Sequence, residues 1–160
     1  MISIIERRFR FLYFFNFSHE VKFMSKNFSR KTVLITGASS GIGLATALNF
    51  QKQGWNVSAT MRNPSAQNTL ASLPNVICPQ LDVTQPDTIT HAIETTLDHF
   101  GKIDVLVNNA GYALMGAFET NDAEQVKRQF DTNVFGLMEV CRQILPHFRR
   151  YRAGLIINVA

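Results

Sequence analysis

From Lys31 onward, short apolar runs alternate along the chain with longer stretches that mix apolar and polar residues. The runs are rich in Val, Ile and Leu and lack the strict alternation of half-exposed strands, which is typical of strands buried on both faces of a parallel sheet. They predict five strands, at 32–35, 55–60, 76–78, 103–107 and 155–159. Helices are predicted between them, at 44–53, 64–73, 84–100 and 121–150. This order predicts an α/β fold built on one parallel sheet.

Two of the predicted helices carry further signals. Thr84 and Asp87 have the spacing of a capping box, and Gly101 is placed to end that helix. Its apolar residues recur at helical spacing and predict a buried face, made of Ile89, Ile93, Leu97 and Phe100. The last helix has Asn121 and Glu124 at its start. Its predicted buried stripe is formed by Val126, Phe130, Val134, Leu137, Cys141, Ile144 and Phe148.

The first strand leads straight into a glycine-rich loop, Thr36-Gly37-Ala38-Ser39-Ser40-Gly41-Ile42-Gly43, which a helix follows. Glycine allows sharp backbone turns and the close approach of an anion, and the first N–H groups of a helix have no partners within it. A strand, a glycine loop and a helix start therefore form a site for the diphosphate of a nucleotide. No Gly-Lys-Ser/Thr follows, so the loop is not a Walker A loop. A purely structural glycine turn is the alternative interpretation.

This loop resembles the cofactor loop of the classical short-chain dehydrogenases/reductases. Asn108-Asn109-Ala110-Gly111 resembles the second signature of that family, and Asn133 falls where the family places an asparagine in its active site. The resemblance spans residues 31–160 and implies a Rossmann-like, doubly wound sheet of strand order 3-2-1-4-5, the NAD(P)-binding domain of an oxidoreductase. The cofactor-binding residues that it implies are Thr36, Gly37, Ser39, Ser40, Gly41, Ile42, Gly43, Arg62, Asp82, Val83, Asn109, Ala110 and Gly111.

The resemblance also implies roles for single residues. It assigns Asp82 to the adenine amino group, Asn108 to bracing the sheet near Thr36, and the small residues of the second signature to the adenosine ribose. Asn133 would be catalytic, holding a water in a proton relay. Two alternatives stay open: Asp82 as a cap or turn residue, and Asn133 as a core asparagine whose amide is hydrogen-bonded.

The end of the second strand bears on which nicotinamide cofactor binds. NAD-binding proteins of this kind usually carry an acidic residue there, which holds the ribose 2′-hydroxyl. This chain has Thr60-Met61-Arg62-Asn63, with no carboxylate and one arginine. An arginine can hold a 2′-phosphate through forked, charge-assisted hydrogen bonds. The sequence therefore predicts NADP in preference to NAD, with a merely solvated Arg62 as the alternative.

In the resembled family, a serine just past the fifth strand and a Tyr-x-x-x-Lys on the next helix complete the catalytic site. The residues four positions after Tyr112 and Tyr151 are Gly116 and Leu155, so neither tyrosine fits. General acid–base catalysis is typically worth about 10²–10⁴-fold. We therefore expect a C-terminally incomplete, at best feebly active form of an enzyme that transfers hydride between NADP(H) and a carbonyl or secondary alcohol. A non-catalytic nucleotide-binding fragment is the alternative, and the fifth strand is expected to leave an apolar edge exposed.

Composition adds limits to these predictions. The 46% apolar and 18% charged residues are ordinary for a globular domain. Residues 1–31 hold seven Lys and Arg against two Asp and Glu, and the remainder holds nine against ten, so the domain itself gives no argument for nucleic acid. Cys78 and Cys141 form no spacing motif; no metal site is predicted, and a reducing, cytoplasmic setting is expected. The histidines are predicted to be surface residues, and the resemblance implies a small-molecule substrate and a possible homo-oligomer.

Residues 1–30 form a leader in which arginines alternate with aromatic residues. Its longest apolar run, 11–15, is far too short to span a bilayer. A segment lying on a membrane surface is one interpretation. The other, which we favour, takes Met24 as the true start, so that residues 1–23 are not translated. Leader residues that are translated are expected to be disordered. The NAD(P)-binding domain is expected over residues 31–160.

Overall fold

The computed structural model describes residues 30–66 and 68–159. Apart from Arg30, the predicted leader lies outside the described residues. The described chain forms five strands, β1 (Thr32–Ile35), β2 (Asn56–Ala59), β3 (Val76–Ile77), β4 (Val105–Asn108) and β5 (Leu155–Asn158). All of them fall within the predicted apolar runs, apart from Asn108 at the end of β4.

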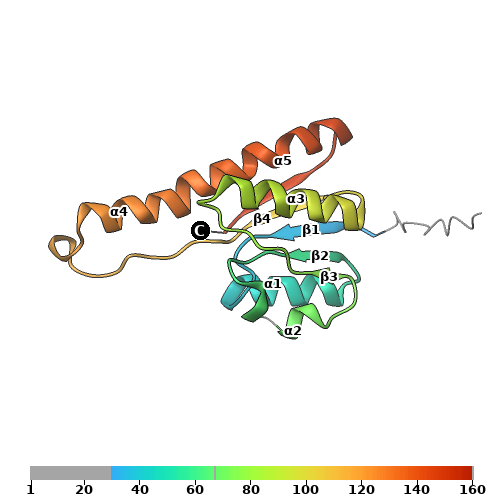
Figure 1. Cartoon of the computed structure of the whole chain (residues 1–160), viewed down its shortest axis with the longest axis horizontal. Helices are drawn as coiled ribbons and strands as arrows, with labels where there is room; N and C mark the ends of the chain where they lie inside the picture. Colours follow the sequence, from blue (N-terminus) through green and yellow to red (C-terminus); the bar gives the residue numbers. More distant parts are fainter. Residues whose placement is uncertain (1–29, 67, 160) are drawn as a thin grey trace, which may run out of the picture.

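The five strands form one sheet of order β3-β2-β1-β4-β5, and every pairing is parallel (Figure 1). The central strand is β1, where Ile35 lies opposite both Ala59 of β2 and Val107 of β4. This confirms the predicted Rossmann-like sheet and its strand order. The carboxyl ends of all strands meet at one edge, which is where ligands bind in open sheets of this kind.

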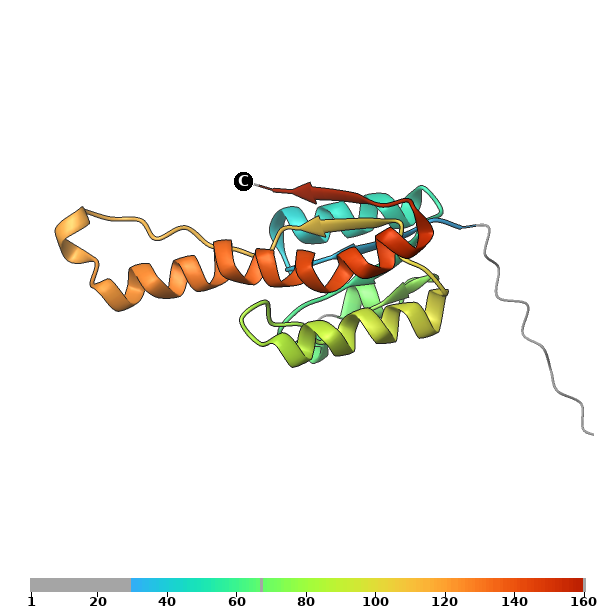
Figure 2. The same ribbon diagram turned by 90° about the horizontal axis from the view of Figure 1, so that it is seen from above.

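Helices cover both faces of the sheet (Figures 1 and 2). One face carries α1 (Gly41–Lys52), the short 3₁₀ turn Pro64–Ala66 and α2 (Asn68–Ala71); the other carries α3 (Pro86–Phe100) and α5 (Leu137–Tyr151). Side chains alternate along each strand, so Val33 and Ile35 join the core under α1, whereas Leu34 joins the core under α3 and α5. Burial on both faces explains why the central strands read as continuous apolar runs.

The α3 helix begins differently from the prediction. Gln85 occupies the N-cap position and Pro86 the first helical position, and the Gln85 side chain makes no capping hydrogen bond. The hydroxyl of Thr84 donates instead to Asp82 Oδ1 at 2.8 Å, so the predicted capping box is wrong. A nearby carboxylate competes successfully for a hydroxyl that would otherwise cap the helix. The predicted end is confirmed, since Gly101 closes the helix with a left-handed φ of 85°.

The single helix predicted over 121–150 is three consecutive pieces. They are α4 (Ala123–Phe130), a π-helical segment (Asp131–Gly136, the π segment) and α5. Asp122 and Gln125, not Asn121 and Glu124, form the capping box that starts α4. With the loop before it, α4 projects beyond the carboxyl ends of the strands as an arm (Figures 1 and 2).

The predicted apolar stripe of this helix is therefore only half correct. Ile144 and Phe148 are buried in α5, joined there by Val140, which the predicted stripe did not include. Phe130 and Val134 are instead 50% and 38% exposed. The π segment puts i→i+5 bonds into the helix and rotates the stripe, and the arm has no sheet beneath it to pack against.

The fifth strand confirms the predicted apolar edge. Leu155 and Ile157 are 53% and 39% exposed, although both belong to a strand paired with β4. Within residues 30–66 and 68–159, no strand lies on the other side of β5. None of the helices in this part of the chain has the length and apolar character that crossing a bilayer requires.

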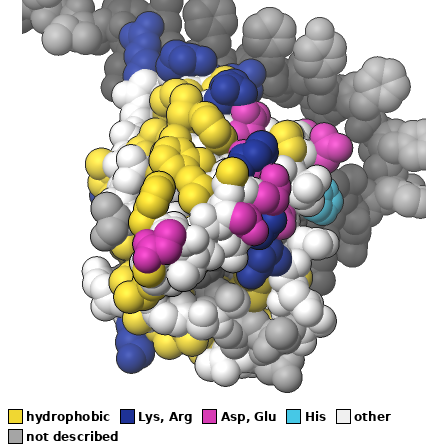
Figure 3. Space-filling model, turned by 90° about the vertical axis from the view of Figure 1, so that its left-hand side faces the viewer, with side chains coloured by type: hydrophobic (Ala, Val, Ile, Leu, Met, Phe, Trp, Pro, Cys, Tyr) yellow, Lys and Arg dark blue, Asp and Glu magenta, His cyan; other side chains and the backbone are white. Residues whose placement is uncertain are grey.

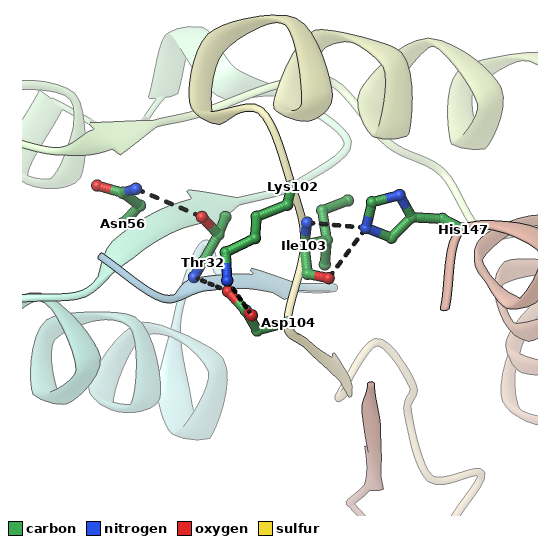
Figure 4. A network of polar contacts seen from close by, with 6 residues as sticks. All are labelled: Thr32, Asn56, Lys102, Ile103, Asp104 and His147. Atoms are coloured by element: carbon green, nitrogen blue, oxygen red, sulfur yellow. Dashed lines mark hydrogen bonds and ion pairs between the residues drawn. The ribbon is translucent and has the colours of Figure 1, made fainter. Parts of the chain in front are cut away.

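A polar network ties together the amino ends of the central strands (Figure 4). Asp104 Oδ2 accepts the Thr32 N–H at 2.8 Å, and Asp104 Oδ1 pairs with Lys102 at 2.7 Å. His147 reaches in from α5, with Nε2 3.1 Å from both the N and the O of Ile103. His91 and His99 are exposed as predicted, but His147 is half-buried, which corrects the prediction that it is a surface residue.

Burial lowers the pKa of His147, and the positive charge of Arg150 lowers it further. The hydrogen bond to the Ile103 backbone and the negative charge of Asp104 raise it in part. The folded state then binds this proton less readily than the unfolded state, so His147 should cost stability as pH falls below about 6.5. We expect the free energy of unfolding in urea to fall less between pH 7.5 and 5.0 for His147→Gln than for wild type. His91→Gln, at an exposed position, is the matched control and should keep the wild-type slope. Equal slopes for all three proteins would show that His147 has no such effect.

Candidate cofactor-binding site

Two turns meet at the carboxyl edge of the sheet and are joined by a set of hydrogen bonds. Thr36, which follows β1 and is 1% exposed, accepts at Oγ1 the backbone N–H groups of Asn109 and Ala110, both at 3.0 Å. In return, Asn109 Nδ2 donates to the carbonyls of Thr36 and Gly37, both at 3.1 Å. The two predicted motifs are therefore one structural unit, the Thr36–Asn109 junction.

The structure corrects the role expected for the first asparagine of the second signature. Asn108 does not brace the sheet near Thr36; its Nδ2 donates to Asn158 Oδ1 of β5 at 3.0 Å and to Cys141 Sγ of α5 at 3.3 Å. Asn109 takes the expected role instead. Consecutive residues of a strand point to opposite sides, so only one of the two asparagines can face the turn after β1.

The glycine loop folds tightly against this junction. Gly37 and Gly41 have φ values of 67° and 54°, in the left-handed region that favours glycine. Gly43 is buried, and a Cβ there would lie 2.3 Å from the Gly37 carbonyl oxygen and 2.5 Å from Asn109 Nδ2. A larger residue at position 43 would push the start of α1 away from the loop. The three glycines thus bring the first turn of α1 directly over the end of β1.

The outer side of the same loop is open. Ser39, Ser40 and Gly41 are exposed, and Ile42 is 63% exposed. Ser40 is the N-cap of α1, and within the described part of the chain its side chain caps none of the first-turn N–H groups. An anion can therefore reach these donors and the positive end of the helix dipole. The exposed backbone of the glycine loop at the start of α1 leaves room for the diphosphate of a dinucleotide.

The end of β2 is fastened to the glycine loop. The Thr60 hydroxyl donates to the Ile35 carbonyl at 2.9 Å, and the Ala38 N–H donates to the Thr60 carbonyl at 2.9 Å. Met61 is buried, and Arg62 follows it with an exposed side chain. Arg62 therefore stands at the same edge of the sheet as the loop.

Asp82 and Val83 form a corner before α3. Asp82 Oδ1 accepts the N–H of Thr84 at 2.9 Å, so Asp82 is a turn residue, as one of the two interpretations held. Its contact with adenine remains a prediction. Val83 is 7% exposed and lies against the backbone of Gly136 in the π segment.

Asn133 lies in the π segment, and the oxygen and the nitrogen of its side-chain amide both bond to the backbone of one residue. Oδ1 accepts the Tyr112 N–H at 3.1 Å, and Nδ2 donates to the Tyr112 carbonyl at 2.8 Å. Gly111 lies so close that a Cβ there would be 3.1 Å from Asn133 Oδ1. Asn133 is thus a hydrogen-bonded asparagine that holds the turn after β4, and its catalytic role remains a prediction.

Three contributors to this site were missed by sequence reasoning. Thr60 fastens the glycine loop, Tyr112 is the partner of Asn133, and Gly136 allows the close contact with Val83. Only Gly136 carried a usable signal, since a glycine within a predicted helix interior indicates a packing or functional reason. Tyr112 and the Thr60 carbonyl act as backbone groups, which any residue type supplies, although the Thr60 hydroxyl adds a side-chain bond to Ile35.

The family model for short chain dehydrogenases matches residues 31–160, and this chain belongs to that family. The 3-ketodihydrosphingosine reductase of Bacteroides thetaiotaomicron is 40% identical over 128 residues, which cover 80% of this chain and 46% of the relative. The 11-beta-hydroxysteroid dehydrogenase 1A of Arabidopsis thaliana is 35% identical over 153 residues, which cover 90% of this chain and 44% of the relative. This chain spans less than half the length of these curated relatives.

Solved structures show the same fold. A short-chain dehydrogenase from Streptomyces avermitilis matches with a TM-score of 0.77 and 35% identity, over 82% of this chain and 49% of the other. ElxO with NADP bound matches with a TM-score of 0.73 and 32% identity, over 82% of this chain and 55% of the other. A variant of the actinorhodin polyketide ketoreductase with NADPH matches with a TM-score of 0.76 and 29% identity, over 83% of this chain and 54% of the other. The chain therefore carries the fold of an oxidoreductase family, and its neighbours support binding of a nicotinamide cofactor.

The Thr36–Asn109 junction yields a stability prediction. Thr36→Val keeps the shape of the side chain but removes the oxygen that accepts two N–H groups. We expect the free energy of unfolding, measured by urea titration, to fall by about 2 kcal/mol, because unpaired buried donors lose their hydrogen bonds to water without replacement. Thr36→Ser keeps the acceptor and should lose less than half of that amount. A Thr36→Val protein as stable as Thr36→Ser would contradict the assignment.

Proposed function

We propose that this protein is an NADP-dependent oxidoreductase that transfers hydride between NADP(H) and a carbonyl or secondary alcohol. The observation that carries the proposal is the Thr36–Asn109 junction, which fixes an open, glycine-lined helix start at the carboxyl edge of the sheet. A cofactor held there by its diphosphate would supply the hydride donor or acceptor, its nicotinamide ring. The residues of this chain bind and orient the cofactor.

In this proposal the glycine loop holds the diphosphate. Gly37, Ser39, Ser40, Gly41, Ile42 and Gly43 lie around it, with the first-turn N–H groups of α1 as donors. Hydrogen bonds to a charged group contribute about 1.5–3 kcal/mol each, so a few donors suffice to hold a diphosphate. Thr36 and Asn109 keep the loop in place, Ala110 and Gly111 leave room for a ribose, and the Asp82–Val83 corner takes the adenine.

The preference for NADP rests on Arg62. Its exposed guanidinium follows β2, whose end is fastened to the glycine loop through Thr60. A 2′-phosphate carries a charge that an acidic residue here would repel and an arginine attracts. Structural neighbours that contain NADP or NADPH support this choice.

The substrate is proposed to be largely apolar. The loop from Tyr112 to Phe118 leaves the site along the arm, and Met115 and Phe118 are each 87% exposed. Viewed toward the arm, hydrophobic side chains gather in a broad area on the upper part of the molecule (Figure 3). Relatives named as a 3-ketodihydrosphingosine reductase and an 11-beta-hydroxysteroid dehydrogenase support an apolar carbonyl compound or alcohol. The chemistry also needs a proton donor, which in the short-chain dehydrogenases/reductases is a tyrosine after the fifth strand.

The rival hypothesis is a nucleotide-binding protein without catalysis. The two are separated by incubating the full-length protein with NADPH and a panel of apolar ketones, and following absorbance at 340 nm. Ketone-dependent oxidation of NADPH supports the proposed function. Binding of NADPH without turnover of any ketone or the corresponding alcohol supports the rival.

Arg62→Glu tests the cofactor preference. We expect the Kd for NADPH to rise about 10- to 100-fold, because a charge-assisted hydrogen bond becomes a repulsion, while the Kd for NADH changes less than about threefold. Arg128→Glu makes the same charge change on the arm and should leave both constants near the wild-type values. Both would be measured by titrating nucleotide fluorescence. Equal weakening of NADPH and NADH binding by Arg62→Glu would show that Arg62 does not meet the 2′-phosphate.

Asn133→Ala tests the π segment in catalysis. The substitution removes the acceptor of the Tyr112 N–H and one of the two side-chain donors to the Tyr112 carbonyl, the other being Gln129 Nε2 at 3.2 Å. The turn after β4 can then shift, and a displacement of about 1 Å can cost about 10²-fold in rate. We expect kcat of the full-length protein to fall by about that factor, with a smaller change in the Kd for NADPH. Asn121→Ala, which removes a half-buried amide of the arm whose Nδ2 donates to the Ala117 carbonyl at 3.3 Å, is the matched control. An unchanged kcat for Asn133→Ala would exclude a catalytic or positioning role for this side chain.

A further inference from the structure

Gly136, the last residue of the π segment, is glycine because of space and not because of backbone conformation. Its φ of −63° and ψ of −47° are ordinary helical values that any residue adopts. It is buried, however, and a Cβ there would lie 2.7 Å from Val83 Cγ2, 2.9 Å from Val83 Cβ and 3.0 Å from the Val83 carbonyl oxygen. Real Cβ atoms do not approach other atoms as closely as the first two distances. The helix backbone therefore touches Val83 directly.

This contact bears on a corner that has little freedom of its own. Asp82 Oδ1 accepts both the N–H and the hydroxyl of Thr84, at 2.9 and 2.8 Å, and the Asp82 N–H donates to Thr88 Oγ1 at 3.0 Å. The corner and the first turn of α3 therefore move as one piece. A displacement of Val83 by a larger residue at position 136 would carry Asp82 with it.

The same π segment also fixes the other side of the site. Asn133, one turn before Gly136, holds both backbone groups of Tyr112. One short segment thus contacts the corner before α3 and the turn after β4. π-Helical turns of this kind occur frequently at functional sites. Asn133 lies within the segment and Gly136 at its end, so a larger residue at position 136 would act on Val83 directly and on Tyr112 only through the helix.

We propose that Gly136 is a positioning residue for the adenosine half of the dinucleotide: its missing side chain sets how close the Asp82–Val83 corner lies to the glycine loop. This inference rests on the proposed function, in which that corner receives the adenine. The new element is that Gly136 affects the binding of one part of the cofactor, the adenosine half, through Val83 and not by its own contact with the cofactor. Overpacking at position 136 should therefore weaken the adenosine half of the site and leave the nicotinamide half intact.

The test uses the full-length protein and two half-cofactors, 2′,5′-ADP and reduced nicotinamide mononucleotide, with Kd values from calorimetric titration. We expect Gly136→Ala to raise the Kd for 2′,5′-ADP about tenfold, a free-energy difference of about 1.4 kcal/mol, and the Kd for the mononucleotide less than about twofold. Met138→Ala, on the exposed face two residues on, is the matched control. A merely structural role would lower the melting temperature without separating the two halves.

A double-mutant cycle with Val83→Ala identifies the contact, since this substitution removes Cγ2, the nearest of the three Val83 atoms that the new methyl group would meet. In the Val83→Ala background, Gly136→Ala should raise the Kd for 2′,5′-ADP by less than about threefold. That comparison also serves if Gly136→Ala alone does not fold. The inference is overturned if 2′,5′-ADP binding is unchanged by Gly136→Ala, if both half-cofactors weaken equally, or if the double variant is unfolded or about tenfold weaker than Val83→Ala. A wild-type protein that binds neither half-cofactor would instead refute the proposed function.

Discussion

The hydrogen bonds between Thr36 and the Asn109–Ala110 turn are the constraint on which the rest of the site depends. They are partly buried, they are reciprocal, and they join segments more than seventy residues apart in sequence. Gly43 packs against the same asparagine, and Ala38, two residues after Thr36, is fastened to β2 through Thr60. The start of α1 is therefore held in place before any ligand arrives, which lowers the ordering cost of binding.

The two halves of the site are supported in different ways. The glycine loop rests on the sheet itself, whose central strands are buried on both faces. The corner before α3 and the turn after β4 rest on the π segment, which begins where the helix leaves the sheet and becomes the arm. A helix without the π segment would present different residues to Val83 and Tyr112. The irregular turn thus serves contacts that a regular α-helix would not make at this spacing.

The sequence predicts the sheet well because a strand buried on both faces leaves an unmistakable pattern, as in Thr32–Ile35. It also predicts which loops meet at the carboxyl edge of the sheet, since the glycines at positions 37, 41 and 43 mark the tight turn after β1. It fails where the outcome depends on competition between neighbours, as when Asp82 takes the Thr84 hydroxyl from the helix start. It fails again at Asn108 and Asn109, because identical residues in a row do not reveal which one faces β1. The π segment and the exposed arm were missed because a helical period gives no sign of where the supporting sheet ends.

The strand order also has a consequence for synthesis on the ribosome. The central strand β1 leaves the ribosome first, can pair with β2 early, and must wait for β4 to cover its other edge. About 70 residues separate β1 from β4, and at ~5–20 residues per second their translation takes several seconds. During that interval the edge formed by Thr32–Ile35, entirely buried in the finished fold, is open to other nascent chains. Chaperone protection of the emerging chain is therefore needed most in the window between the second strand and the fourth.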